Sequence, residues 1–194
     1  METACQTATH TNIAPRNRTI LRLPNPPSKP IIPQVRRGVS YILPGPQDYI
    51  PHPKTEQPVF GYVPSLPALP GHTVCVPVVL TEGHQSNDDT GMGAAHAWAQ
   101  HRRDIEAVGG RTAADTALLV ARVIVEGTPL YLEHGFHSQT RLVAYRPGSG
   151  TVVLGLFKFG YHRRWQVITA HGGKGHLGDS IGEIAEARPI QPLC

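Results

Sequence analysis

The spacing of hydrophobic and polar residues changes at Pro129, and this change separates two kinds of predicted element. Before Pro129, apolar residues recur at helical spacing over residues 94–108 and 113–126. Gly109-Gly110 separates the two segments, and Thr112 is placed to cap the second. This region therefore predicts two successive helices.

After Pro129 the pattern alternates between apolar and polar residues, as it does in strands with one buried face. Four strands are predicted, at residues 130–133, 140–145, 151–159 and 165–170. The third is long and apolar, which indicates a central place in the sheet. Short turns favour antiparallel neighbours, so the predicted fold is α+β, with two helices followed by a four-stranded antiparallel β-meander. One helical turn is expected in the glycine-rich tail, around residues 181–187.

Prolines are concentrated early in the chain, where 15 of the 19 lie between Pro15 and Pro77. Each proline removes a backbone donor and favours extended geometry before it, so neither a helix nor a central strand is expected up to residue 70. We therefore predict a proline-rich, extended or partly disordered N-terminal segment over residues 1–85 and a compact α+β domain over residues 86–194. The β-branched run 72–80 predicts a strand that Pro77 confines to an edge.

Charge and cysteine content narrow the class of protein. A formal net charge of +4 and a pI near 9.2 are compatible with a polyanionic partner such as RNA. The three cysteines, Cys5, Cys75 and Cys194, are too scattered to indicate a disulfide framework or a cysteine zinc site. No apolar stretch resembles a signal peptide or a membrane span. We expect a cytoplasmic protein, in the producing cell or in a target cell, that does not enter membranes.

Candidate catalytic side chains are a hydroxyl, histidines and cations near the predicted strand ends. Thr169 and His171 are two residues apart, so in a regular strand they share a face with each other and with Val167. RNA cleavage without a metal needs a base for the 2′-hydroxyl proton, an acid for the leaving 5′-oxygen, and cations around the phosphate. His137 and His171, with Thr169 and Arg164, supply these roles. This mechanism uses no metal or other cofactor.

Further cationic and aromatic residues are candidates for holding the substrate phosphate and stacking on its bases. These candidates are His134, Arg146, Lys158, Arg163 and Trp165. By contrast, His101, Arg102 and Arg103 are expected on the solvated face of the first helix. Trp98 and Ile105 are expected to pack that helix onto the core.

The C-terminal half resembles the barnase–EndoU–colicin–RelE superfamily of nuclease toxin domains. The resemblance covers residues 94–171 and rests on the order of elements and on the final strand, which ends Val-Ile-Thr-Ala-His at residues 167–171. It implies metal-independent cleavage of RNA, including tRNA, by a bacterial toxin with a cognate immunity or antitoxin protein. By this resemblance Thr169 and His171 match the final-strand positions and His137 an earlier acid–base position. The cation that holds the phosphate would be Arg146, Lys158 or Arg164.

Three other interpretations remain open at this point. Apolar residues in the proline-rich segment, such as Phe60 and Val63, favour an accessory protein of a phage or plasmid that binds a partner without catalysis. The spacings His134-x-x-His137 and His171-x4-His176 are compatible with a histidine metal site. An ADP-ribosyltransferase is a third alternative, for which the sequence offers no clear set of residues.

Overall fold

The structure, a computed structural model, describes residues 48–86, 90–133, 140–159, 162–175 and 178–185. All of these residues belong to one compact unit that spans residues 33–194. The domain boundary expected near residue 85 lies inside this unit. No helix in the described part of the chain is long and apolar enough to cross a membrane.

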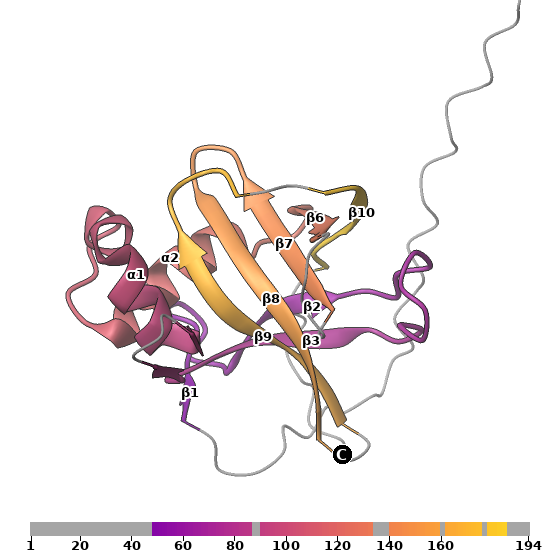
Figure 1. The fold of residues 1–194 in the computed structure, drawn as a ribbon, viewed down its shortest axis with the longest axis horizontal. Coiled ribbons are helices and arrows are strands. Elements are labelled where there is room, and N and C mark those ends of the chain that lie inside the picture. Colours follow the sequence, from indigo (N-terminus) through magenta and orange to yellow (C-terminus); the bar gives the residue numbers. More distant parts are fainter. Residues whose placement is uncertain (1–47, 87–89, 134–139, 160–161, 176–177, 186–194) are drawn as a thin grey trace, which may run out of the picture. The chain divides into compact units, whose positions relative to one another are not determined.

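The main sheet has eight strands, shown in Figure 1. They are β1 (Tyr49–Ile50), β2 (Val59–Val63), β3 (Val76–Thr81), β6 (Pro129–Leu132), β7 (Arg141–Arg146), β8 (Gly150–Phe159), β9 (His162–His171) and β10 (Ser180–Glu183). The order is β1-β3-β9-β8-β7-β6-β10, and β2 also pairs with β3. A separate pair is formed by β4 (His84–Gln85) and β5 (Gly91–Met92).

The two ends of this sheet meet. Ala185, just after β10, forms a bridge with Tyr62 of β2, in which the Ala185 N–H donates to the Tyr62 carbonyl at 2.8 Å. Gly61 lies at this junction, where an added Cβ would stand 3.0 Å from Ile124 and 3.1 Å from Ile184. A larger residue at position 61 would therefore push the two ends apart.

The predicted fold, two helices followed by a four-stranded antiparallel meander, is wrong because the sheet is larger and mixed. Strands β6 to β9 are successive antiparallel neighbours, but they form only part of a mixed, eight-stranded sheet in which β3 runs parallel to β9. Strands β1 and β2 come from residues 49–63, where prolines had excluded a central strand. The strand predicted at residues 72–80 is present as β3, but it is interior and not at an edge. Residues 180–183 form a further strand, β10, instead of a helical turn.

Pro77 shows how a proline is accommodated in this sheet. It lies in β3 opposite Tyr62 of β2, and β3 is an interior strand because β9 pairs with its other edge. The pairing with β9 involves Val78 and Val79, the two residues that follow Pro77. Pro77 therefore lies just outside the stretch that is paired on both edges, so its missing N–H does not interrupt the parallel ladder.

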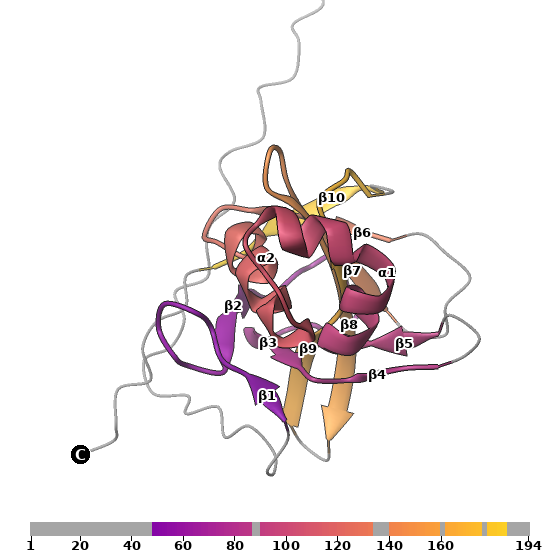
Figure 2. The same cartoon turned by 90° about the vertical axis from the view of Figure 1, so that its left-hand side faces the viewer.

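Two helices cover one face of the sheet, as Figure 2 shows from their side. They are α1 (Gly93–Ala107) and α2 (Thr116–Val123), and a short 3-10 turn at Ala113–Asp115 leads into α2. Their buried side chains join those of the central strands in one core. Its members include Ala97, Ile105, Leu119, Val120, Val78, Leu80, Val152, Leu154, Trp165 and Val167.

The second helix ends earlier than the sequence predicted. Residues 124–126 are not helical, and Ile124 has a ψ of 79°. The Thr128 hydroxyl donates to the Val123 carbonyl at 2.7 Å, and the Gly127 N–H donates to the Ile184 carbonyl at 2.9 Å. These bonds satisfy groups that a longer helix would use, and the β-branched residues 123–125 favour extended geometry.

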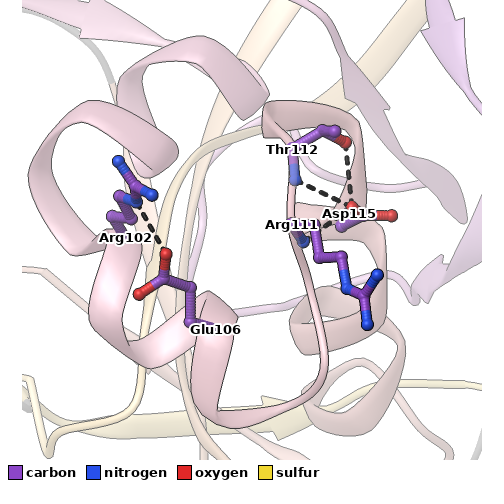
Figure 3. Close-up of polar contacts among 5 residues, drawn as sticks. All are labelled: Arg102, Glu106, Arg111, Thr112 and Asp115. Carbon is purple, nitrogen blue, oxygen red and sulfur yellow. Dashed lines mark hydrogen bonds and ion pairs between the residues drawn. The ribbon is translucent and has the colours of Figure 1, made fainter.

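The start of the 3-10 turn is fixed by Asp115 (Figure 3). Its Oδ2 accepts hydrogen bonds from the N–H groups of Arg111 and Thr112, both at 2.8 Å, and from the Thr112 hydroxyl at 2.9 Å. These hydrogen bonds, above all the one from the Arg111 backbone, lower the pKa of Asp115. Figure 3 also shows the exposed pair of Arg102 and Glu106 on α1, joined at 2.7 Å.

An Asp115→Ala variant is expected to be less stable than the wild type near neutral pH, because three donors lose their acceptor. The native pKa of Asp115 is lowered, so the stabilisation is present above the ordinary carboxyl pKa and is lost as the pH falls through the native pKa. Thermal melting at several pH values measures this. A difference in Tm that stays constant down to pH 2 would contradict the prediction.

Candidate functional site

The strand that carries Thr169 and His171 changes face at a bulge. Trp165, Val167 and Ala170 all belong to the core, although Val167 and Ala170 are three residues apart. The register explains this, because Val153 pairs with Thr169 and its neighbour Leu154 pairs with Val167, which leaves one extra residue in β9. The bulge therefore takes Val167 out of alternation with Thr169 and His171.

His171 lies against a second histidine, His101 of α1. The centroids of the two imidazole rings are 5.0 Å apart and the ring planes are inclined by 39°. His101 has φ −131° and ψ 30°, which are not helical values, so α1 is kinked at this residue. The kink thus occurs at the residue that brings the two imidazoles together.

Asp104 joins the helix to the end of β9. Its Oδ2 accepts a hydrogen bond from the Gly172 N–H at 2.9 Å. A Cβ at residue 172 would stand 3.1 Å from Asp104 Oδ1, so glycine permits this close approach. Asp104 follows His101 by three residues, a spacing that places both side chains on one side of a helix.

The electrostatic environment favours neutral imidazoles. Burial lowers the pKa of His171, and the negative charge of Asp104 acts against this by raising it. Burial also lowers the pKa of His101, the charge of His171 lowers it further, and Asp104 raises it. The two histidines therefore titrate as a coupled pair, in which protonating one disfavours protonating the other.

Thr169 and Thr151 add hydroxyls to this end of the sheet. The Thr169 Oγ1 is buried and has no hydrogen-bond partner within the described residues. Thr151 of β8 pairs with His171, and its Oγ1 donates to the Gly173 carbonyl at 2.6 Å and accepts from the Gly175 N–H at 3.1 Å. We call His101, Asp104 and His171 the histidine-pair site.

Arg164 is not brought to this site. It lies seven residues before His171 on β9, which corresponds to roughly 20 Å along a strand. Its guanidinium is buried, with Nη1 donating to the Tyr49 hydroxyl at 2.6 Å and Nη2 to Gln166 Oε1 at 3.0 Å. The Gln166 amide in turn donates to the Thr81 hydroxyl at 2.9 Å. Arg164 therefore ties the short strand β1 to the sheet.

The other proposed phosphate contacts are divided between the two ends of the strands. Lys158 and Arg163 pair with each other at the end of the β8–β9 hairpin remote from His171, and Arg163 Nη1 donates to the Gly71 carbonyl at 2.6 Å. Arg146 pairs with Gly150 at the same end as His171, and its guanidinium donates to the Arg122 carbonyl at 3.1 Å.

Trp165 lies in the core and is completely buried, so it cannot stack on a base in this structure. Its Nε1–H donates to His72 Nε2 at 2.9 Å. Burial lowers the pKa of His72, which favours the neutral imidazole that this bond requires. The pair fastens the loop before β3 to the middle of β9.

His134 and His137 lie outside the described residues. The residues that sequence reasoning missed are His101 and Asp104, because His101 had been placed on the solvated face of the helix. The i, i+3 spacing of an imidazole and a carboxylate was the available signal, while the kink itself leaves no recognisable pattern in the sequence.

The described residues offer neither a metal site nor a reactive thiol. Among the described residues, no group of three or more His, Cys, Asp or Glu side chains could hold a metal ion. Burial raises the pKa of the Cys75 thiol to about 11, so this cysteine stays protonated near neutral pH and is a poor nucleophile.

Comparisons with protein-family models, with curated proteins and with solved structures found no match for this chain.

Proposed function

We propose that this protein is a metal-independent endoribonuclease whose acid–base pair is His101 and His171. The observation that carries the proposal is the contact between two half-buried imidazoles, with ring centroids 5.0 Å apart, beside the Asp104 carboxylate. An imidazole moves protons near neutral pH, and two of them supply both the base and the acid of a phosphodiester cleavage.

The reaction would begin with one neutral imidazole taking the proton of a ribose 2′-hydroxyl. The 2′-oxygen then forms a bond to the adjacent phosphorus while the bond from phosphorus to the 5′-oxygen breaks. The other imidazole, protonated at the start, gives its proton to the leaving 5′-oxygen. At the end of the step the imidazole that began neutral is protonated and the one that began protonated is neutral. No external acid or base is consumed.

Asp104 would serve as a positioning residue. It lies on the same helix as His101 and holds the Gly172 N–H that follows His171. Its charge also raises the pKa of both histidines, which keeps a singly protonated pair populated closer to neutral pH. The Thr169 Oγ1 is buried, so it is not placed to contact a phosphate oxygen directly.

The proposal follows the resemblance of residues 167–171 to the final strand of the toxin nuclease superfamily, and it assigns to His101 the role that the resemblance gave to His137. A toxin of this kind would act on RNA in the cytoplasm of the producing or target cell. It would be neutralised there by a cognate immunity or antitoxin protein.

Expression of the full chain under tight induction tests this function. The wild type is expected to arrest growth and to yield discrete RNA fragments, whereas a His171→Ala variant is expected to do neither. A His162→Ala variant, which changes an exposed histidine at the other end of β9, should behave as the wild type. Normal growth and intact RNA with soluble wild-type protein would contradict the proposal.

The pH dependence of cleavage is expected to be bell-shaped, with its maximum below pH 6.5. Activity requires one neutral and one protonated imidazole, and both pKa values are lowered from 6.5 in the folded protein. Above the higher pKa the rate should fall about tenfold per pH unit, because the acid form is lost. Initial values of kcat/KM between pH 4 and 8 measure this.

An Asp104→Asn variant tests the cause of the pH profile. Removing the negative charge lowers the pKa of both histidines, so the whole profile should move toward lower pH. A maximum at or above pH 6.5 in the wild type, or an unchanged profile in the Asp104→Asn variant, would contradict the assignment of the pair.

A further inference from the structure

The loop that follows His171 has the sequence Gly172-Gly173-Lys174-Gly175. We call it the glycine–lysine loop. It begins directly after the proposed catalytic histidine and lies at the end of the sheet where Thr151 pairs with His171. The loop has no part in the acid–base steps, which leaves its own role to be explained.

The loop is fastened at three backbone positions. The Gly172 N–H donates to Asp104 at 2.9 Å, and the Gly173 carbonyl accepts from the Thr151 hydroxyl at 2.6 Å. The Gly175 N–H donates to the same Thr151 oxygen at 3.1 Å. A Cβ at residue 175 would stand 3.0 Å from the Thr151 methyl group, so glycine lets the loop approach β8 this closely. A loop held in this way presents its remaining groups in a fixed position.

The groups that remain are suited to an anion. Within the described part of the chain, the N–H groups of Gly173 and Lys174 donate no hydrogen bond to the protein. Gly173 has no side chain to cover His171, and an added Cβ there would contact only the His171 Nδ1, at 3.6 Å. Lys174 is exposed and adds a positive charge next to these two donors. Backbone N–H groups and a lysine charge are both groups that bind phosphate.

Three cations that the sequence suggested as phosphate ligands are less suited to this site. Lys158 and Arg163 lie at the opposite end of the β8–β9 hairpin. Arg146 lies at the correct end, but its guanidinium donates to the Arg122 carbonyl. Asp104 is the nearby negative charge, and it faces the Gly172 N–H, one residue before the two available donors.

We propose that the glycine–lysine loop is the phosphate-binding element of the histidine-pair site, with Lys174 as its cation. This rests on the proposed function only for the identity of the phosphate, which would be the scissile phosphodiester of RNA. The binding of an anion beside His171 is a separate property, and it can be measured without any turnover.

The test titrates the full-length protein with inorganic phosphate. Binding is monitored by NMR through the resonances of the His171 ring protons. In the wild type, phosphate should shift these resonances with saturation, and a Lys174→Gln variant should bind about tenfold more weakly because a charge-assisted contact is lost. Lys174→Arg should retain most of the affinity. Lys158→Gln is the matched control, since it removes an exposed lysine at the remote end of the hairpin.

Equal affinity of the wild type and Lys174→Gln, or an equal loss in Lys158→Gln, would overturn the proposal, because the effect would then be general electrostatics. Cleavage assays separate this result from the proposed function. Phosphate binding that depends on Lys174 in a protein without ribonuclease activity would keep the loop assignment and reject the enzyme. Ribonuclease activity unaffected by Lys174→Gln would keep the enzyme and reject the loop.

Discussion

A His171→Ala variant is expected to cleave RNA with kcat/KM lowered by about 10²–10⁴-fold, the usual contribution of a positioned acid or base. The reason is that His101 alone cannot supply both proton transfers within one turnover. The half-buried imidazole of His171 also contacts His101, so circular dichroism and thermal melting must show that the variant remains folded. Rates are measured on a defined RNA oligonucleotide in the presence of a chelator.

His162→Ala is the matched control for this result, because His162 is an exposed histidine of the same strand. Its activity should be within about twofold of the wild type, in line with the small effects of surface substitutions. A folded His171→Ala variant with wild-type kcat/KM would remove His171 from the site.

A Trp165→Ala variant is expected to lose about 3–5 kcal/mol of unfolding free energy, the usual cost of deleting a fully buried aromatic side chain. Trp165 has no exposed surface and packs in the core between the helices and the sheet. Its loss also removes the Nε1–H that donates to the buried His72. Urea unfolding of the wild type and the variant measures the difference.

Trp165→Phe separates the two contributions. Phenylalanine retains part of the ring volume and removes the donor to His72, so the loss should be smaller than in the alanine variant, with about 1–3 kcal/mol of it from the unsatisfied buried polar group. An alanine variant as stable as the wild type but with weaker RNA binding would restore the original expectation that Trp165 stacks on bases.

The sequence patterns that identified elements correctly are local ones. The structure has strands at residues 129–132, 141–146, 150–159 and 162–171. These are close to the ranges that the alternation after Pro129 predicted. Thr112 lies at the start of the second helical region as expected, although the acceptor there is the Asp115 carboxylate. These features depend on residues close together in the chain, which is why spacing and capping preferences are informative about them.

The β-branched run at residues 72–80 predicted a strand, which is β3, but the interior position of β3 and the strands of residues 49–63 were not predicted from local patterns. These features depend on long-range pairing, such as Val78 with Trp165 and Tyr62 with Ala185. The presence of Pro77 predicted an edge strand. This prediction was wrong because β9 pairs only with Val78 and Val79, which follow Pro77. The apolar residues of this segment were the better guide, since Phe60 and Val63 are both in the core.

The candidate site was predictable only in part. The i, i+2 spacing of Thr169 and His171 placed them on one face. The bulge in β9 turned that face away from Val167, and a bulge has no clear sequence pattern in this strand. Arg164 has the charge of a phosphate ligand, yet its partners Tyr49 and Gln166 hold it elsewhere. His101 lies at a kink in α1 and contacts His171, which are tertiary features.

The central claim, that His101 and His171 act as one acid–base pair, is tested most directly by a double-mutant cycle in single-turnover cleavage. Residues that act as a unit are strongly non-additive, so His101→Ala, His171→Ala and the double variant should all be slowed to a similar extent. Each protein is the purified full chain, assayed with chelator and shown to be folded. A His101→Ala variant that cleaves RNA as fast as the wild type would contradict the account.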